Sequence, residues 1–582
     1  MPWALVALVL VPLVASAIGL LATVGGDYHP RGDIAGIELH TRDVGRHPVL
    51  MGLYSREGWN HPGPMLFYVL AVPYRLLGEL SASLHVGALL VNGVAVAGMA
   101  LVARRRGGTP LFLLTLVGSA VVISSFGPEL LRDPWNVSIT VFPFGLLVFL
   151  VWELTCGRAR SLPAAAVVTT FCVQTHVGYA VLALPLLLWG VAWLVVPAWR
   201  GRRSREASGE VAGTWSDLRR PALLALALVV ALWLPPVGEH FGGRDGNLGR
   251  IVDYLTAEHD EEDGHTLGDG VRLVSSKFGL SPEWVTGEKE LTTFTAEPVS
   301  LTSAPVPVFL GAYAVALVVL WRRGSRSARR LAMTVTFTLA LGVIWVSRII
   351  GPVFDYRLGW LSVLAMIAFV VIAWAAWLLV AERTGPGLAR GVGLAAVVPL
   401  FVLGAASADD GARAGTPANW GSSSQVESMA EEILAKLPDR DGDIIIDCSD
   451  EGCIPHAGLV LLLERAGEPV RVSRWGGLVS ADADHRVHER DAPRRARLHV
   501  EVNSAFKRFD RAADRPGAGL LSYRGELPLD ERNRLVAEVR ELDRDLRAGR
   551  IDEVDHFARR SKIGQQLSTR AVAVYQDEPE RR

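Results

Sequence analysis

The stretch that decides the fold begins with GGDYHPRGDIAGIELHTRDVG at residues 25–45 and continues with YSREGWNHPGPMLFYVLAVPYRLLG at residues 54–78. It directly follows residues 3–24, an uncharged apolar segment that is long enough to cross a bilayer, since a crossing needs about 20 residues. This order of segments predicts a membrane helix followed by a loop at the lipid boundary that is rich in Asp, Glu, His and Arg. Polar chemistry at that boundary is the first indication of function.

This stretch resembles a known kind of loop. An acid, Asp33, comes just after the first membrane helix, the pair His61-Pro62 follows, and an aromatic-rich run then closes on Arg-Leu-Leu-Gly. The order is similar to the first extracytoplasmic loop of polyprenyl-phosphate-sugar glycosyltransferases with the C-type (GT-C) fold, such as the protein O-mannosyltransferases and the lipid A aminoarabinose transferases. The likeness is looser beyond the first loop and absent at the C-terminus. Many of those enzymes carry two adjacent acids, whereas here Asp33 is followed by Ile34 and the next acid is Glu38.

Composition limits the class of protein. The 582 residues are 50% hydrophobic, with a very apolar first part joined to a charged tail, and the net charge of −1 gives no reason to expect nucleic-acid binding. Four cysteines are too few for a disulfide framework. Cys156 and Cys172 lie in apolar surroundings and are expected to be packing residues. Cys448 and Cys453 are close enough in sequence for one small disulfide, with two unpaired thiols as the alternative.

Hydropathy predicts about eleven membrane spans: residues 3–24, 84–103, 111–125, 137–154, 162–175, 179–197, 221–236, 305–321, 331–346, 358–380 and 392–406. Basic clusters follow every second span, at residues 104–106, 158–160, 200–205, 322–330 and 383–390. By the positive-inside rule these connections are cytoplasmic, so the N-terminus is predicted to be cytoplasmic and the C-terminal domain extracytoplasmic. Residues 62–77 are then an interfacial helix that does not cross.

The predicted fold is a mostly α, polytopic membrane helix bundle of the GT-C type with a C-terminal extracytoplasmic α/β domain. Residues 1–408 form the membrane domain, with extracytoplasmic loops at 25–83 and 237–304. Residues 409–424 are a linker, and residues 425–582 form the soluble domain. In that domain the pattern predicts helices at 426–437, 456–466 and 529–548, and strands at 443–448, 469–473 and 498–502.

Asp33 is the candidate general base. In the reaction that the resemblance implies, an acceptor hydroxyl loses a proton while it attacks the anomeric carbon of a lipid-phosphate sugar, and one positioned carboxylate can take that proton. The leaving phosphate is already anionic, so it needs arginine more than a proton donor. The alternative is that Asp33 only caps the helix that begins at Ile34.

Other polar residues of the outer loops are candidates for substrate binding. Glu38 and Arg42 are four residues apart, which also suits an ordinary helical ion pair. Asn60 and His61 precede two prolines and a glycine that predict a rigid turn, and we expect His61 to contact the acceptor or the donor phosphate.

The later outer loops add four more candidates. Asp133 matches a second acid in some relatives, or caps the helix that follows. His176 lies between two apolar spans, where ionisable groups usually face an interior cavity, although a satisfied core histidine is the alternative. One of Arg348 and Arg357 is expected to bind the donor phosphate, unless Arg357 simply pairs with Asp355.

A divalent cation is a further possibility. The run of acids and one histidine at residues 258–263, with His265 after it, attracts cations, but its spacing fits no metal motif and such runs are usually only solvated.

The function that the resemblance implies is sugar transfer from a polyprenyl-phosphate donor to an extracytoplasmic glycan, lipid or protein, in the plasma membrane. The alternative from another class is a transporter or flippase of lipid-linked glycans. That reading predicts charges near the middle of the membrane and an internal repeat, whereas here the charges gather in the loops and no repeat is visible. A third reading is an inactive receptor or scaffold that works through its outer domain.

Overall fold

The structure, a computed structural model, describes residues 2–55, 57–199, 215–242, 246–257, 264–287, 308–381, 383, 395–417, 423–437, 441–448, 454–472, 484–486, 494–503, 519–525, 528–548, 550–551, 556, 559–560, 562–563 and 571–576. The chain forms two compact units. The first comprises Met1–Gly26, Leu50–Leu53 and Glu57–Pro417, and the second comprises Asp27–Val49, Tyr54–Arg56 and Ala418–Arg582. This division differs from the expected boundaries at 408 and 424, because most of the first loop packs with C-terminal residues.

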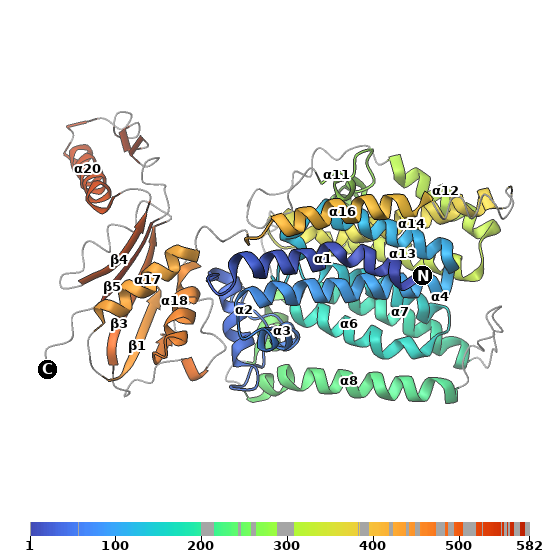
Figure 1. Cartoon of the computed structure of the whole chain (residues 1–582), viewed down its shortest axis with the longest axis horizontal. Coiled ribbons are helices and arrows are strands. Elements are labelled where there is room, and N and C mark those ends of the chain that lie inside the picture. The colour runs from blue at the N-terminus through green and yellow to red at the C-terminus, as the bar shows by residue number, and fades with distance from the viewer. Residues whose placement is uncertain are drawn as a thin grey trace. The chain divides into compact units, whose positions relative to one another are not determined.

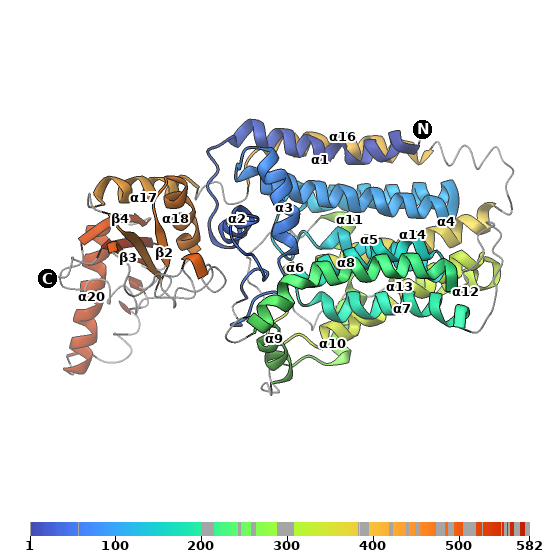
Figure 2. The same cartoon turned by 90° about the horizontal axis from the view of Figure 1, so that it is seen from below.

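The first unit is a helix bundle (Figures 1 and 2). Its elements are α1 Pro2–Val24, α3 Met65–Leu76, α4 Ala82–Leu131, α5 Val141–Thr155, η1 Ala159–Ser161, α6 Leu162–Thr175, α7 Tyr179–Trp199, α8 Trp215–Gly242, α9 Asn247–Thr256, α10 Leu267–Ser276, α11 Glu283–Thr286, α12 Val308–Arg323, α13 Arg326–Val346, η3 Asp355–Leu358, α14 Gly359–Ala381 and α16 Val397–Arg413.

Six helices in the described part of the chain are long and apolar enough to cross a membrane, namely α1, α4, α7, α8, α13 and α14. The protein is therefore a multi-pass membrane protein. Each of the predicted spans overlaps a described helix, and two of them fall in α4. The count of about eleven crossings stays a prediction, as does the interfacial position of α3, which is a helix of 12 residues.

The helix α4 contains two of the predicted spans. Gly108 has φ 67° and ψ −162°, a conformation that only glycine adopts easily, and it interrupts the helix. Beyond it the chain turns back, because the amide of Asn92 donates to the Leu131 carbonyl at 2.8 Å and the Nδ1 atom of His85 lies 3.0 Å from the Arg132 carbonyl. The basic residues 104–106 thus lie at a turn between two antiparallel stretches.

Helices from the two ends of this unit lie side by side, α1 against α16 (Figures 1 and 2). Small residues allow this approach: a Cβ on Gly19 would lie 2.5 Å from the Ala412 carbonyl oxygen, and one on Gly411 would lie 3.0 Å from the Pro12 carbonyl oxygen. Close backbone contact at glycines is a common way to pack helices in membranes.

The second unit is built on a five-stranded mixed sheet. Its elements are α2 Gly32–Asp43, α17 Ser423–Lys436, β1 Asp443–Cys448, α18 Ile454–Arg465, β2 Val470–Val472, η5 Asp484–Arg486, β3 Arg494–Asn503, β4 Gly519–Gly525, α20 Leu529–Arg547 and β5 Ala571–Gln576. The strand order is β2-β1-β3-β5-β4, in which β1 runs parallel to β2 and β3, and β5 runs antiparallel to β3 and β4. The expected strands and helices coincide with described elements, whereas β4 and β5 were not expected.

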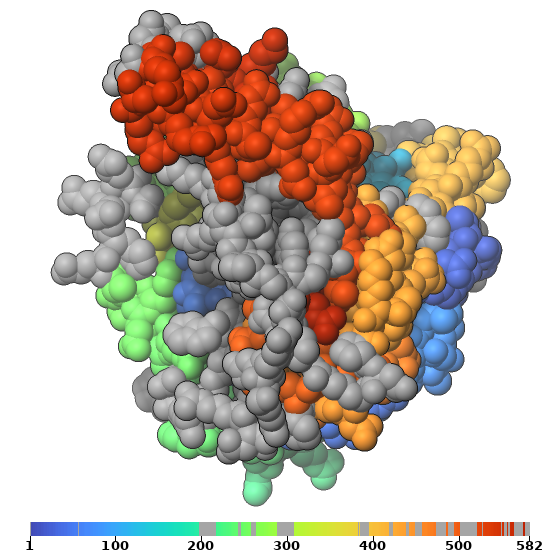
Figure 3. All heavy atoms as spheres, turned by 90° about the vertical axis from the view of Figure 1, so that its left-hand side faces the viewer, coloured from blue at the N-terminus to red at the C-terminus, as the bar shows by residue number. Residues whose placement is uncertain are grey.

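The core of the second unit includes residues from the first loop. Ile444 and Ile446 of β1 alternate onto one face of the sheet, where they pack with α17 and α18. Ala35 and Leu39 of α2 belong to the same cluster. The helix α20 carries its own small apolar cluster, which includes Leu535, and Figure 3 shows this helix as the red ridge at the top of the unit.

Candidate functional site

The loop before α3 has a defined conformation. The N–H of Gly52 donates to the His61 carbonyl and the N–H of His61 donates to the Leu53 carbonyl, both at 2.9 Å. The N–H of Asn60 donates to the side-chain oxygen of Asn247, whose amide donates back to the Asn60 carbonyl, both at 2.8 Å. These four hydrogen bonds fix the direction in which the following histidine projects.

Two histidines from distant segments meet in the first unit. The ring centroids of His61, in this loop, and His176, at the end of α6, lie 4.7 Å apart with the planes inclined by 33°. The backbone N–H of Val177 donates to Nδ1 of His61 at 3.3 Å, and that of Gly178 donates to Nδ1 of His176 at 3.2 Å. A backbone N–H can only donate, so both Nδ1 atoms are unprotonated and each neutral ring carries its hydrogen on Nε2.

Both imidazoles are neutral near pH 7. Burial lowers the pKa of His61 well below its ordinary value, and the neighbouring His176 and Arg357 lower it further. Burial and then the charge of Arg357 lower the pKa of His176 to about 3. Within the described part of the chain, neither Nε2 atom has a hydrogen-bond partner. The pair therefore offers two neutral N–H donors.

Arg357 supplies the positive charge. It lies in η3, with its guanidinium carbon 5.8 Å from the centroids of both the Phe354 and Tyr356 rings. The ring of Tyr356 in turn packs on Trp135 at 5.0 Å. Among the described residues Arg357 has no ion pair, so the alternative pairing with Asp355 is not formed. Arg348, the other arginine of this loop, is exposed at the end of α13.

Asp133 has a structural task in the second outer loop. Its carboxylate accepts from the Trp135 N–H at 3.1 Å and from the Ser138 hydroxyl at 2.6 Å, so it caps the turns that lead into α5. The neighbouring Asn136 donates to the Thr175 carbonyl at 3.3 Å. The loop is thereby placed beside the turn that carries His176, and the capping alternative describes Asp133 well.

Asp33 lies in the first turn of α2, in the second unit. The residue at the N-cap is Arg31, so Asp33 is not the N-cap that the alternative expected. An acid in the first turn still interacts favourably with the helix dipole. The carboxylate is half-buried.

Glu38 and Arg42 on α2 form ion pairs with α18. The fully buried Glu38 accepts from Nη2 of Arg465 at 2.5 Å, and Nη1 of Arg42 donates to Glu464 at 3.0 Å. These pairs account for both side chains without a substrate. Their expected role in substrate binding stays a prediction from the sequence alone.

Asp43, at the end of α2, is not a solvated helix terminus. It is 4% exposed, and Arg486 donates to both of its oxygens, at 2.6 and 2.9 Å. Arg486 also donates to Glu464 at 2.6 Å. Burial raises the pKa of Asp43, but the hydrogen bonds from His485 and Arg486 outweigh it and lower that pKa to about 2.

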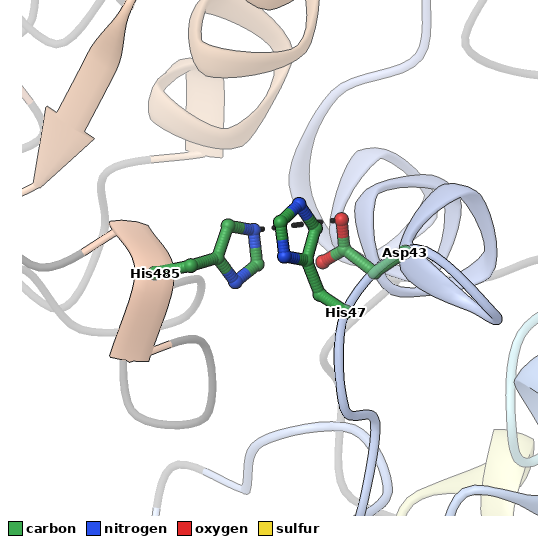
Figure 4. A group of neighbouring side chains, drawn as sticks. All are labelled: Asp43, His47 and His485. Atoms are coloured by element: carbon green, nitrogen blue, oxygen red, sulfur yellow. Dashed lines mark ion pairs between the residues drawn. The ribbon is translucent and has the colours of Figure 1, made fainter.

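Asp43, His47 and His485 are the kinds of side chain that hold metal ions, and their ligand atoms lie within 4.8 Å of one another (Figure 4). The geometry does not suit coordination. The two imidazoles are stacked, with centroids 3.8 Å apart and planes only 7° from parallel. The lone pairs of parallel stacked rings do not converge on one ion, and Arg486 already binds both carboxylate oxygens. This cluster is an ionic contact within the second unit.

Residues 258–263, where the sequence suggested a cation site, lie outside the described residues. His265 is described, and its Nε2 atom lies 2.8 Å from the Gly351 carbonyl. Cys453 of the suggested disulfide is also outside the described residues. Cys156 and Cys172 are both buried, as expected of packing residues.

Sequence reasoning missed several residues that shape these sites. Asn247 forms hydrogen bonds with the loop that carries His61. Tyr356 packs against Arg357 and against Trp135, and Arg486 forms an ion pair between η5 and α2. Only the aromatic residues carried a signal, because each lies within two residues of a predicted candidate.

Comparisons with known proteins identify the fold. No protein-family model and no curated protein sequence matches the chain. The structure of ArnT from Cupriavidus metallidurans bound to undecaprenyl phosphate aligns with 89% of this chain and 96% of its own, with a TM-score of 0.53 and 12% identity. The chain has the ArnT fold.

A second ArnT structure, in the apo state, aligns over the same shares with a TM-score of 0.50 and 13% identity. ArnT is a lipid A aminoarabinose transferase of the GT-C class. The resemblance in the first loop therefore pointed to the right fold. An oligosaccharyltransferase from Archaeoglobus fulgidus aligns with 80% of this chain and 62% of its own at 13% identity, but its TM-score of 0.37 is too low to support an argument.

Proposed function

We propose that this protein is a membrane glycosyltransferase of the GT-C type. It transfers a sugar, a hexose or a pentose, from a polyprenyl-phosphate donor to a glycan, lipid or protein acceptor outside the cytoplasm. The ArnT fold supports this proposal, since one ArnT structure holds undecaprenyl phosphate. The alternation of basic connections supports an extracytoplasmic position for the loops that carry His61, His176 and Arg357.

One observation carries the proposal. Arg357 has no ion pair within the described part of the chain, and its charge lowers the pKa of both His61 and His176. The two imidazoles are neutral, and their Nε2–H groups have no described hydrogen-bond partner. A cation next to neutral donors suits a phosphate monoanion or dianion, because charge-assisted hydrogen bonds to phosphate are strong and arginine is suited to them. Neutral imidazoles add donors without adding a proton that titrates near neutral pH.

In the proposed reaction, the acceptor oxygen forms a bond to the anomeric carbon as the bond from that carbon to the phosphate oxygen breaks. The electron pair leaves with the polyprenyl phosphate, where Arg357 and the two histidines stabilise the added charge. The acceptor's hydroxyl proton goes to a carboxylate. Asp33 is proposed for that role on the strength of the sequence resemblance.

The experiment uses the full chain, purified in lipid, with radiolabelled polyprenyl-phosphate sugars and a membrane extract as acceptor. Wild type is compared with Asp33→Asn, and with Asp409→Asn as the matched control. Asp409 is an exposed acid paired with Arg413 at 3.0 Å. We expect transfer by wild type and by the control, and a loss of 100-fold or more in Asp33→Asn, which is the usual scale of a general base.

Each outcome has a defined meaning. Unchanged transfer by Asp33→Asn keeps the enzyme class and removes Asp33 as the base. No transfer from any donor, together with movement of a lipid-linked glycan across the bilayer, would favour the flippase. Neither transfer nor movement, with a phenotype that depends on residues 409–582, would favour the scaffold.

A further inference from the structure

A pocket of about 360 Å³ opens between three helices of the first unit, α7, α12 and α13. Its size falls within the range of small-molecule sites, about 300–1,000 Å³. Its lining is apolar apart from Thr336 and one arginine; it consists of Trp189, Leu317, Leu320, Trp321, Arg329, Ala332, Met333, Thr336, Phe337 and Ala340. We call it the α12–α13 groove.

The groove has a basic end. The helices α12 and α13 are joined by a short turn at which the Ser325 hydroxyl accepts from the Ala328 N–H and caps α13. Arg322 and Arg326 flank this turn, and Arg329 lies one helical turn into α13. In the described part of the chain none of these three arginines has an ion-pair partner.

Arg329 is the informative member of this group. Its side chain is half-buried and lines the apolar groove. A charge in apolar surroundings is costly unless it is paired, so this position calls for an anion. Among the described residues no acid pairs with Arg329, so its charge is available to an anionic ligand.

The wall of the groove is preformed. The rings of Trp189 and Phe337 are stacked, with centroids 4.7 Å apart and planes 18° from parallel. Trp193, on the next turn of α7, contacts Trp189 edge-to-face and lies under the guanidinium of Arg330 at 5.2 Å. These contacts hold the aromatic side chains in place whether or not a ligand is bound.

The length of the groove sets the size of the ligand. From Arg329 to Ala340 along α13 is about 16 Å at 1.5 Å per residue. That distance is close to half of the bilayer's hydrocarbon core, which is about 30 Å thick. A lipid whose headgroup lies at Arg329 would thus extend one chain to the middle of the membrane.

We propose that the α12–α13 groove binds an anionic glycerophospholipid of the leaflet at the basic end of the bundle. One acyl chain lies along Ala332, Thr336 and Ala340, and the phosphate pairs with Arg329. This site is distinct from the His61 and His176 pair, since His176 precedes α7 and the groove uses Trp189 further along that helix. The proposal does not depend on the proposed transferase activity.

The experiment maps photo-crosslinks on the full chain reconstituted in vesicles. Phosphatidylglycerol and phosphatidylcholine carry the same photoreactive acyl chain, and crosslinked peptides are identified by mass spectrometry. We expect crosslinks within residues 332–340, with a yield at least fivefold higher from phosphatidylglycerol. Arg329→Gln should remove that preference, since one basic residue near a membrane surface contributes about a factor of five.

Two further variants separate binding from misfolding. Arg383→Gln removes an exposed arginine after α14 and should leave the preference unchanged. Ala340→Phe adds bulk at an exposed helix position in the groove and should lower the yield from both lipids.

Three results would overturn the proposal. They are equal yields from the two lipids, an unchanged preference in Arg329→Gln, and displacement of the label by polyprenyl phosphate at lower concentration than by unlabelled phosphatidylglycerol. The last result would assign the groove to the isoprenoid lipid instead.

Discussion

The imidazole ring of His61 lies 4.7 Å from that of His176, and each carries an Nδ1 atom that accepts a backbone N–H. The two rings reach this position from the loop before α3 and from the turn between α6 and α7, while Arg357 comes from η3. Two connections between helices thus contribute the histidine pair, and a third contributes the arginine whose charge acts on both rings. Because the histidines are neutral, the affinity of this cluster for an anion depends mainly on the arginine.

The first prediction concerns the choice between two arginines that the sequence left open. Arg357→Gln should lower kcat/KM for the lipid-phosphate donor by about 100-fold, the usual effect of removing one group that stabilises charge in the transition state. The measurement is initial-rate transfer in lipid at several donor concentrations. Arg348→Gln, in the same loop, should lower kcat/KM less than tenfold. A larger loss in Arg348→Gln than in Arg357→Gln would move the phosphate site to Arg348.

The second prediction concerns the ionic network that joins α2 to the rest of the second unit. Arg486→Met leaves the buried Asp43 without its bidentate partner, so it should lower the free energy of unfolding by about 3–5 kcal/mol. Thermal unfolding of the full chain measures this loss, and the signal to monitor is the unfolding transition of the second unit.

A double variant tests the cause of that loss. Asp43→Asn in the Arg486→Met background removes the uncompensated charge and should recover part of the stability. Arg550→Met is the matched control, because Arg550 pairs with Asp545 at an exposed site and such pairs contribute little. An equal loss in the control would mean that the assay does not report this network.

The third prediction is a dependence of stability on pH. Burial, and next the charge of Arg486, lower the pKa of His40 on α2 to about 4, against 6.5 for an ordinary histidine. The unfolded chain therefore binds the proton first as the pH falls. Stability is complete above about pH 6.5 and is lost as the pH falls toward 4, by at most about 3 kcal/mol from this residue.

The variant His40→Gln should reduce this loss between pH 6.5 and 4, as measured by melting temperature across that range. His61 and His176, whose pKa values are also lowered, contribute to the loss that remains. Asp43 does not contribute in the same window. Its pKa is lowered to about 2, so its stabilisation is lost only as the pH falls below about 4 toward 2. Parallel pH curves for wild type and His40→Gln would contradict the assignment.

The sequence predicted local secondary structure better than it predicted which distant segments pack together. The apolar run of β1 was sufficient to place that strand at residues 443–448, because a buried strand needs only its own side chains to be recognised. β5 was missed because its neighbours in the sheet, β3 and β4, end at residues 503 and 525, so no short hairpin connection marks the strand at residues 571–576.

The same limit applies to the candidate site. Glu38 and Arg42 have the spacing of a helical pair, yet each has a partner on α18, which lies far away in sequence. Residue type and loop position were enough to select His61, His176 and Arg357 one by one. Their convergence follows from how the helices pack, and a single sequence carries no direct record of that packing.

The last prediction tests the support of the His61 loop. A Cβ on Gly63 would lie 2.4 Å from Oε1 of Gln174 and 2.5 Å from its Cδ, and the amide of Gln174 is fixed by donation to the Leu232 carbonyl at 2.8 Å. Gly63→Ala should therefore shift the loop and cost about 1–3 kcal/mol, the usual scale of overpacking, as measured by thermal unfolding. It should also reduce transfer, because His61 lies two residues away. Gly238→Ala in α8 is the control, since nothing lies within 4 Å of the added Cβ, and it should be neutral or slightly stabilising. If Gly63→Ala behaves like this control, the loop has more room than the Gln174 contact implies.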